Sequence, residues 1–211
     1  MVVFANPFKL LKHGVLGMNM RNVDFVYAYN PRHLFPQVDD KLITKRLAEN
    51  AGIAVPKLYG VVQFQHQIKL LPKLLESYDQ FVVKPSKGSG GKGILVVTGK
   101  QNEYYIKASG SLFDKNDLDH HVSNIVSGLY SLGGQIDSSM IEYYVNFSPL
   151  FKDISYQGVP DIRVLLFQGY PAMAMLRLPT RISDGKANLH QGAIGVGIDI
   201  QSGTTLGGVY H

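Results

Sequence analysis

Residues 81–98 read FVVKPSKGSGGKGILVVT, and this stretch decides the fold. One apolar, β-branched run ends in Lys84 and a second begins at Ile94, so the sequence predicts two strands joined by a loop. The loop consists of glycine, serine and lysine. Glycine lets backbone N–H groups approach phosphate oxygens, and Lys84, Lys87 and Lys92 supply positive charge. The pattern therefore predicts a lid over a polyphosphate, with ATP as the first ligand to consider.

The same loop contains partial matches to other phosphate-binding motifs. Gly88, Gly90 and Gly93 spell G-x-G-x-x-G, but the dinucleotide motif needs a helix after the last glycine, and here a strand follows. A Walker A motif needs Gly-Lys-Ser/Thr at the start of a helix, whereas Lys92 is followed by Gly93. A protein kinase carries its lysine after the loop, and the chain contains no H-R-D or D-F-G. The remaining alternative is a glycine-rich surface hairpin without a ligand.

The composition is that of a globular protein. Of the 211 residues, 45% are hydrophobic and 18% are charged, which excludes a disordered chain. There is no cysteine, so disulfides and thiolate zinc sites are excluded, in agreement with a cytoplasmic protein. No apolar run could span a bilayer, and residues 1–18 lack the h-region of a signal peptide. The net charge is +5, but the basic residues are scattered, so we expect an anionic nucleotide rather than a nucleic acid as partner.

Helices and strands mix along the chain without strict alternation, which indicates the α+β class. Asp39 and Asp40 precede an amphipathic helix that Gly52 closes, with Ile43, Leu47 and Ala51 on its apolar face. A short helix is expected around residues 70–77, and a second amphipathic helix covers residues 116–132, with Leu118, Val122, Ile125 and Leu129 on one face. The predicted strands are residues 58–64, 81–85, 93–98, 104–108, 139–145, 162–167 and 172–178. A loop covers residues 146–160, a Gln-Gly-Tyr-Pro turn joins the last two strands, and glycine-punctuated β structure covers residues 193–210.

Three further features bear on a phosphate site. Glu142 lies inside the apolar strand IEYYV, where the alternative is an edge residue that faces solvent. Asp161 and Arg163 are two residues apart and so share a strand face, where the alternative is a surface ion pair. Arg177 ends an apolar strand, and KANLHQG follows at residues 186–192, where a lone His190 is more often structural than catalytic.

Taken in order, these segments resemble the ATP-grasp superfamily, and within it the α-L-glutamate ligase-like branch that includes the sugar-transfer-associated ATP-grasp proteins. The resemblance runs from about residue 29 to residue 211 and rests on VDDKLITKRLAENAGIAVP, FVVKPSKGSGGKGI, IEYYV, DIRV and MLRLPT…ANLHQGA. It implies two α+β subdomains with ATP between two antiparallel sheets. Residues 1–56 would be a helical lead-in, residues 57–140 the subdomain with the glycine-rich loop, and residues 141–211 a second, truncated subdomain.

The resemblance also implies roles for particular residues. Lys41 and Lys84 would contact the ATP phosphates, and the backbone of residues 142–145 would hold adenine. Asp161 would accept from the ribose hydroxyls. The implied nucleotide-binding set is Lys41, Lys84, Lys87, Gly90, Gly91, Lys92, Glu142, Tyr143, Tyr144, Val145, Asp161 and Arg163. The implied catalytic set is Arg177, which would face the γ-phosphate, together with Asn188 and His190.

The activity implied is that of an ATP-dependent carboxylate–amine ligase that works through an acyl phosphate, with Mg²⁺ as a second cofactor. The ATP-grasp ligases that this chain resembles hold magnesium with an Asp and a later Glu-x-Asn pair. This chain has no Glu after Glu142, and its only acids beyond Asp161 are Asp184 and Asp199. We therefore expect no metal ligands within the chain and suspect a fragment of a longer ligase.

Two other functions compete with a ligase. The first is a nucleotide-binding module without catalytic activity. The second is a basic polyanion-binding domain, which would bind polynucleotides with steep salt dependence and no preference for ATP.

Overall fold

The computed structural model describes residues 6–146, 148–156, 158–183 and 185–210. The chain divides into two units, Met1–Leu47 and Ala48–His211. None of the helices in the described ranges has the length and apolar character that crossing a bilayer requires.

The first unit is helical, and it ends inside a helix that continues into the second. Its elements are α1 (Pro7–Lys12), α2 (Met18–Met20), the π-helix η1 (Arg21–Tyr27), the 3₁₀ turn η2 (Arg32–Leu34), α3 (Pro36–Asp39) and α4 (Lys41–Asn50). Asp40 caps α4, since its carboxylate accepts from the N–H of Leu42 at 2.9 Å. The expected apolar face is wrong: Leu42 and Lys45 are buried, three residues apart on one face, whereas Leu47 is 45% exposed. The aliphatic stem of a lysine makes such burial feasible.

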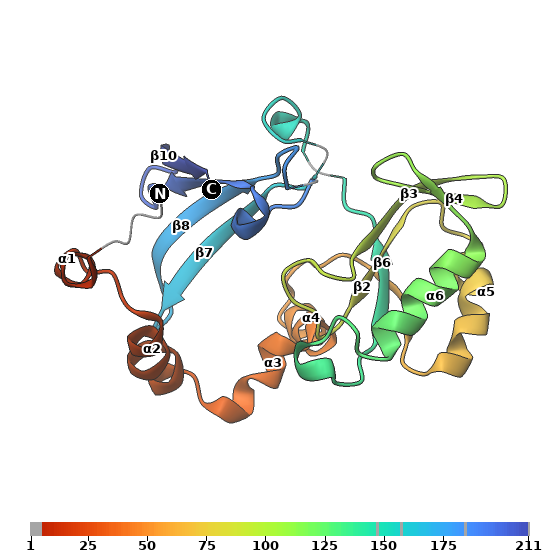
Figure 1. The fold of residues 1–211 in the computed structure, drawn as a ribbon, viewed down its shortest axis with the longest axis horizontal. Helices are drawn as coiled ribbons and strands as arrows, with labels where there is room; N and C mark the ends of the chain where they lie inside the picture. Colours follow the sequence, from red (N-terminus) through yellow and green to blue (C-terminus); the bar gives the residue numbers. More distant parts are fainter. Residues whose placement is uncertain (1–5, 147, 157, 184, 211) are drawn as a thin grey trace. The chain divides into compact units, whose positions relative to one another are not determined.

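The second unit contains a six-stranded antiparallel sheet in the order β1-β6-β2-β3-β4-β5. These strands are β1 (Leu58–Val62), β2 (Phe81–Pro85), β3 (Leu95–Gln101), β4 (Tyr104–Lys107), β5 (Leu112–Phe113) and β6 (Ser139–Tyr143). Helices α5 (Leu71–Leu75) and α6 (Lys115–Val126) cover one face of the sheet (Figure 1). The core lies between them, where Phe81 and Val83 alternate into the side chains of Leu118, Val122 and Ile125.

Short 3₁₀ turns connect these elements: η3 (Gln65–Leu70), η4 (Leu132–Gly134) and η5 (Pro149–Phe151). The predicted second amphipathic helix is shorter than its periodicity indicates and ends at Val126, so Leu129 is 64% exposed and does not join the core. The reason is Gly128, whose φ of +88° turns the chain away from the helix. The predicted loop at residues 146–160 includes Phe147 and Gln157, which lie outside the described residues.

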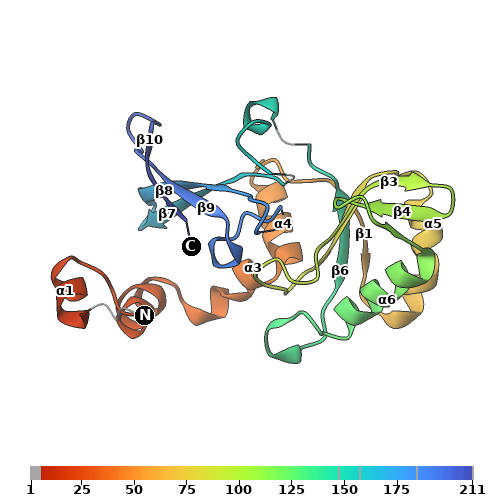
Figure 2. The ribbon, with the colours of Figure 1, turned by 45° about the horizontal axis from the view of Figure 1, so that its top comes forward.

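A four-stranded antiparallel sheet in the order β10-β9-β8-β7 completes the second unit. Its strands are β7 (Asp161–Phe167), β8 (Tyr170–Leu178), β9 (Ile194–Ile198) and β10 (Thr205–Tyr210), and the 3₁₀ turn η6 (Leu189–Gln191) precedes β9 (Figure 2). Gln168 and Gly169 both have positive φ, 50° and 86°, so a two-residue primed turn joins β7 to β8.

The α+β class with two antiparallel sheets is confirmed. The division of the chain at residues 56 and 140 stays a prediction.

Candidate functional site

Lys84 lies on the face of the six-stranded sheet that is opposite to α5 and α6. Phe81 and Val83 point into the core, and Lys84 alternates to the other face. It forms an ion pair with Glu142 of the neighbouring strand β6, and the two side chains are 24% and 3% exposed. The solvent-facing edge position considered for Glu142 is wrong, because β6 lies between β1 and β2 and Glu142 is buried.

The loop of residues 86–93, called the phosphate loop after its predicted ligand, leaves β2 and enters β3. Gly90 and Gly91 have φ of +63° and +78°, and a Cβ on either would meet no atom closer than 3.9 Å. The tip of the loop therefore has glycines where only glycine is unstrained and has open space around them. Lys92 is exposed. Lys87 donates from Nζ to the carbonyl of Ile136 at 3.1 Å, so a phosphate contact would require its side chain to turn.

The tip of the phosphate loop contacts the turn that precedes β9. The side-chain amides of Asn188 and Gln191 both donate to the carbonyl oxygen of Gly90, at 3.3 and 3.2 Å. The Oδ1 of Asn188 also accepts from the backbone N–H of His190, at 3.1 Å, which fixes the turn. Two residues of the candidate set, Gly90 and Asn188, are thus brought together although they lie 98 positions apart.

The same contact identifies two residues that sequence reasoning missed. Gln191 binds Gly90 directly, and a Cβ on Gly91 would lie 3.9 Å from the side chain of Lys186. Both belong to KANLHQG, from which only Asn188 and His190 were selected. The charge of Lys186 and the amide group of Gln191 were the available signals in the sequence. No local sequence pattern shows whether such a side chain contacts another loop or faces solvent.

Asp161 and Arg177 form an ion pair across the four-stranded sheet. They are directly opposite in the β7–β8 ladder, and the guanidinium binds both carboxylate oxygens, with Nε to Oδ1 at 2.6 Å. The alternative pairing within β7 is wrong, since Arg163 lies opposite Met175 and is exposed. The Arg177 side chain is 17% exposed and that of Asp161 39%, so the pair is accessible at the carboxylate.

The remaining predicted residues lie at the end of β6, in η6 and in α4. Tyr143 ends β6, and its N–H donates to the carbonyl of Lys57 at 2.8 Å. The backbone groups of Tyr144 and Val145, which follow, have no hydrogen-bond partner among the described residues. His190 is exposed in η6. Lys41 begins α4 in the first unit.

The described residues do not fit a magnesium site. They contain no group of three or more His, Asp or Glu side chains close enough to hold a metal ion. Asp199 instead caps the turn between β9 and β10, where its Oδ1 accepts from the N–H and the hydroxyl of Ser202, both at 2.7 Å. These hydrogen bonds lower the pKa of Asp199 below its ordinary value. Asp184 lies outside the described residues.

The comparison with known proteins agrees with this architecture. Two antiparallel sheets, one carrying a glycine-rich lysine loop, define the ATP-grasp class of ATP-binding, ligase-type modules. The family model described as sugar-transfer associated ATP-grasp matches residues 20–210, and the chain belongs to this family. The expected ATP-grasp fold is therefore confirmed. The chain matches no curated protein.

Proposed function

We propose that the second unit binds ATP with its phosphates beneath residues 86–93. The observation that carries this proposal is the pair of hydrogen bonds from Asn188 and Gln191 to Gly90. They join a flexible, glycine-rich loop of one sheet to a turn next to the other. Phosphate oxygens are stronger acceptors than a backbone carbonyl, so both amides would bind phosphate when ATP is present.

The proposed phosphate cations surround the same loop. Lys84 faces away from the helices and forms an ion pair with Glu142, and its ammonium has further donors that can be shared with a phosphate. Lys92 at the tip is exposed, and Lys186 lies beside Gly91.

Adenine is proposed to bind the backbone of the residues that follow β6. Adenine carries a donor at N6 and ring acceptors, and a backbone carbonyl and N–H can bind both. Tyr144 and Val145 offer such groups without a partner in the described part of the chain. Asp161 is proposed to accept from the ribose hydroxyls through carboxylate lone pairs that Arg177 does not use.

The reaction proposed for the site is carboxylate activation. A substrate carboxylate oxygen attacks the γ-phosphorus, the bond from this phosphorus to the bridging oxygen breaks, and ADP leaves. An amine then attacks the acyl carbon, phosphate leaves, and the amine releases a proton to give an amide. Arg177 would stabilise charge on the transferred phosphoryl group, and Asn188 and His190 would orient it.

A nucleotide-binding module without catalysis is the second candidate. It is favoured by one observation: the described residues offer no cluster of ligands for the Mg²⁺ that ATP-grasp ligases use. The two candidates share the ATP site and differ in ADP formation.

The first experiment is titration of the 211-residue protein with ATP by calorimetry. Replacing Asn188 and Gln191 with Ala should weaken binding by at least about tenfold, because two hydrogen bonds to an ionised phosphate are lost. Asn116→Ala is a matched control, since Asn116 is an exposed amide on α6, on the opposite face of the sheet. Binding of polynucleotides that exceeds binding of ATP would contradict the proposal and favour the polyanion-binding domain.

The second experiment measures ADP release with Mg²⁺ and a panel of carboxylates and amines. Release that depends on both substrates supports a ligase. ATP binding without release under any combination supports the module.

A further inference from the structure

Both ends of the phosphate loop are fixed by side chains that the proposed function does not use. At the first end, the N–H of Lys87 donates to both oxygens of the Asp137 carboxylate, at 3.0 and 3.1 Å. The N–H of Ser86 donates to the carbonyl of Ser138 at 2.9 Å. Gly88 forms a β-bridge with Ser131. The segment that follows α6 therefore holds the start of the loop through three successive residues.

Asp137 is an unusual residue to find in this position. It is 2% exposed, and its hydrogen-bond donors are the backbone N–H groups of Lys87 and Ser138. A carboxylate withdrawn from water is destabilising unless hydrogen bonds replace its hydration. The backbone N–H of Lys87 supplies part of that replacement. Opening the loop at this end would break its hydrogen bonds to a buried carboxylate, which is energetically costly.

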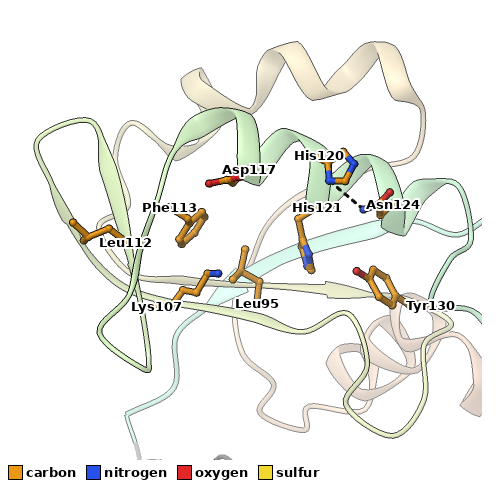
Figure 3. A pocket seen from close by; sticks show the side chains of 9 residues that line it. All are labelled: Leu95, Lys107, Leu112, Phe113, Asp117, His120, His121, Asn124 and Tyr130. Carbon is orange, nitrogen blue, oxygen red and sulfur yellow. Dashed lines mark hydrogen bonds between the residues drawn. The ribbon is translucent and has the colours of Figure 1, made fainter.

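At the other end, Gly93 is held by two aromatic residues. The carbonyl of Gly93 lies 3.0 Å from the Nε2 of His121, which projects from α6 (Figure 3). A Cβ on Gly93 would lie 2.6 Å from the ring of Tyr130, and the rings of Tyr130 and His121 are 5.8 Å apart. A carbonyl can only accept, so Nε2 carries a proton. Burial lowers the pKa of His121 below its ordinary value, which keeps the ring neutral at pH 7.

The helix that carries His121 is firmly packed against the sheet. His121 belongs to a helix that buries Leu118, Val122 and Ile125 against the sheet. Between the two fixed ends lies the tip, residues 89–92, where Gly90 and Gly91 have open space around them and where the side-chain amides of Asn188 and Gln191 bind the carbonyl of Gly90 through exposed hydrogen bonds.

We infer that Asp137 and His121 are positioning residues that fix the two ends of the phosphate loop and confine its movement to residues 89–92. The inference deepens the proposed ATP site and rests on it for the effect on affinity. A short mobile tip loses less conformational entropy on closing over phosphates than a loop that is free along its whole length. Loosening either end should therefore weaken ATP binding although neither side chain touches the nucleotide.

The test compares four variants. Asp137→Asn is nearly isosteric but replaces one acceptor with a donor that faces N–H groups. His121→Phe keeps a ring beside Tyr130 but removes the donor, whereas His121→Gln restores an amide donor near the Nε2 position. His120→Phe is the matched control, because His120 lines the same cavity of about 330 Å³ but contacts Asn124 of its own helix, at 3.3 Å.

Amide hydrogen exchange without nucleotide is the first measurement. We expect about tenfold faster exchange at residues 86–88 in Asp137→Asn and at residues 92–94 in His121→Phe, with His121→Gln and His120→Phe close to the original protein. Because no nucleotide is present, this result stands even if the protein binds no ATP, so failure of the proposed function can be recognised separately.

ATP affinity is the second measurement. We expect the Kd to rise about tenfold in Asp137→Asn and in His121→Phe, and to recover in His121→Gln. Unchanged loop exchange in both disrupting variants would overturn the inference, and so would a His121→Gln variant as loose as His121→Phe. If Asp137→Asn does not fold, the two His121 variants decide the question alone.

Discussion

Replacing Lys84 with Met tests the proposed ATP site most directly. Met keeps most of the volume and flexibility of the lysine stem and removes only the ammonium. In the structure this ammonium pairs with Glu142, on the sheet face opposite to α5 and α6. The substitution should therefore change two quantities, ATP affinity and the free energy of unfolding, for two separate reasons.

The magnitudes follow from the exposure of the pair. A charged hydrogen bond to phosphate contributes about 1–3 kcal/mol, so the Kd for ATP should rise about 5- to 150-fold. The lower half of that range is expected, because Glu142 already neutralises part of the charge. Breaking an exposed ion pair costs about 0–1 kcal/mol and breaking a buried one about 3–5 kcal/mol. With Lys84 24% and Glu142 3% exposed, we expect a loss of about 1–3 kcal/mol of stability.

A double-mutant cycle separates the two effects. Calorimetry gives ATP affinity and urea unfolding gives stability for Lys84→Met, Glu142→Gln and the double variant. Stability should recover in the double variant, because the buried carboxylate charge has been removed as well, whereas ATP affinity should not recover. Unchanged ATP affinity in Lys84→Met would refute the phosphate contact. Recovery of affinity in the double variant would show that the loss reflected folding alone.

Three other predictions concern the loop, turnover and pH. Amide exchange at residues 89–92 should slow when ATP is added, and equally slow exchange with and without ATP would contradict a lid. Mg²⁺-dependent ADP release by the 211-residue protein should be slow but measurable, because the described residues offer no cluster of metal ligands, and robust release abolished by Asp199→Asn would show that Asp199 binds metal rather than capping its turn. Because burial lowers the pKa of His121 in the folded state, the unfolded chain takes up this proton first as pH falls. The contribution of His121 to stability is thus complete above about pH 6.5 and declines below it. Urea unfolding across pH 5–8 should show this decline in the original protein and a smaller one in His121→Gln, and identical slopes would argue against it.

Much of the architecture could be predicted because it depends on local patterns. The β-branched runs around the loop KPSKGSGGKG form β2 and β3. Leu118, Val122 and Ile125, spaced i, i+4, i+7, form the buried face of α6. Element ends were less accurate. The second helix stops at Val126 because of the turn at Gly128, and a periodicity argument carries the pattern on to Leu129.

The candidate site was only partly accessible to such reasoning. The chain order of its motifs was sufficient to indicate the ATP-grasp family, which the match over residues 20–210 confirms. The contacts of individual residues could not be predicted in this way. Side-chain alternation shows which face of a strand a residue occupies, but it does not show which residue of the neighbouring strand lies opposite. The sequence is compatible with an ion pair between Asp161 and Arg163, whereas the register of β7 and β8 in the structure pairs Asp161 with Arg177.

By itself, then, the sequence determined the α+β class, the strand–loop–strand lysine motif and the family, since each is written in residues close together along the chain. Tertiary structure alone decided that Glu142 is central and buried, because strand order places β6 between β1 and β2. It also decided that Asp137 holds Lys87, 50 residues away, and that Asn188 reaches Gly90, 98 residues away. Contacts at such separations depend on how sheets and turns assemble, and no local periodicity encodes them.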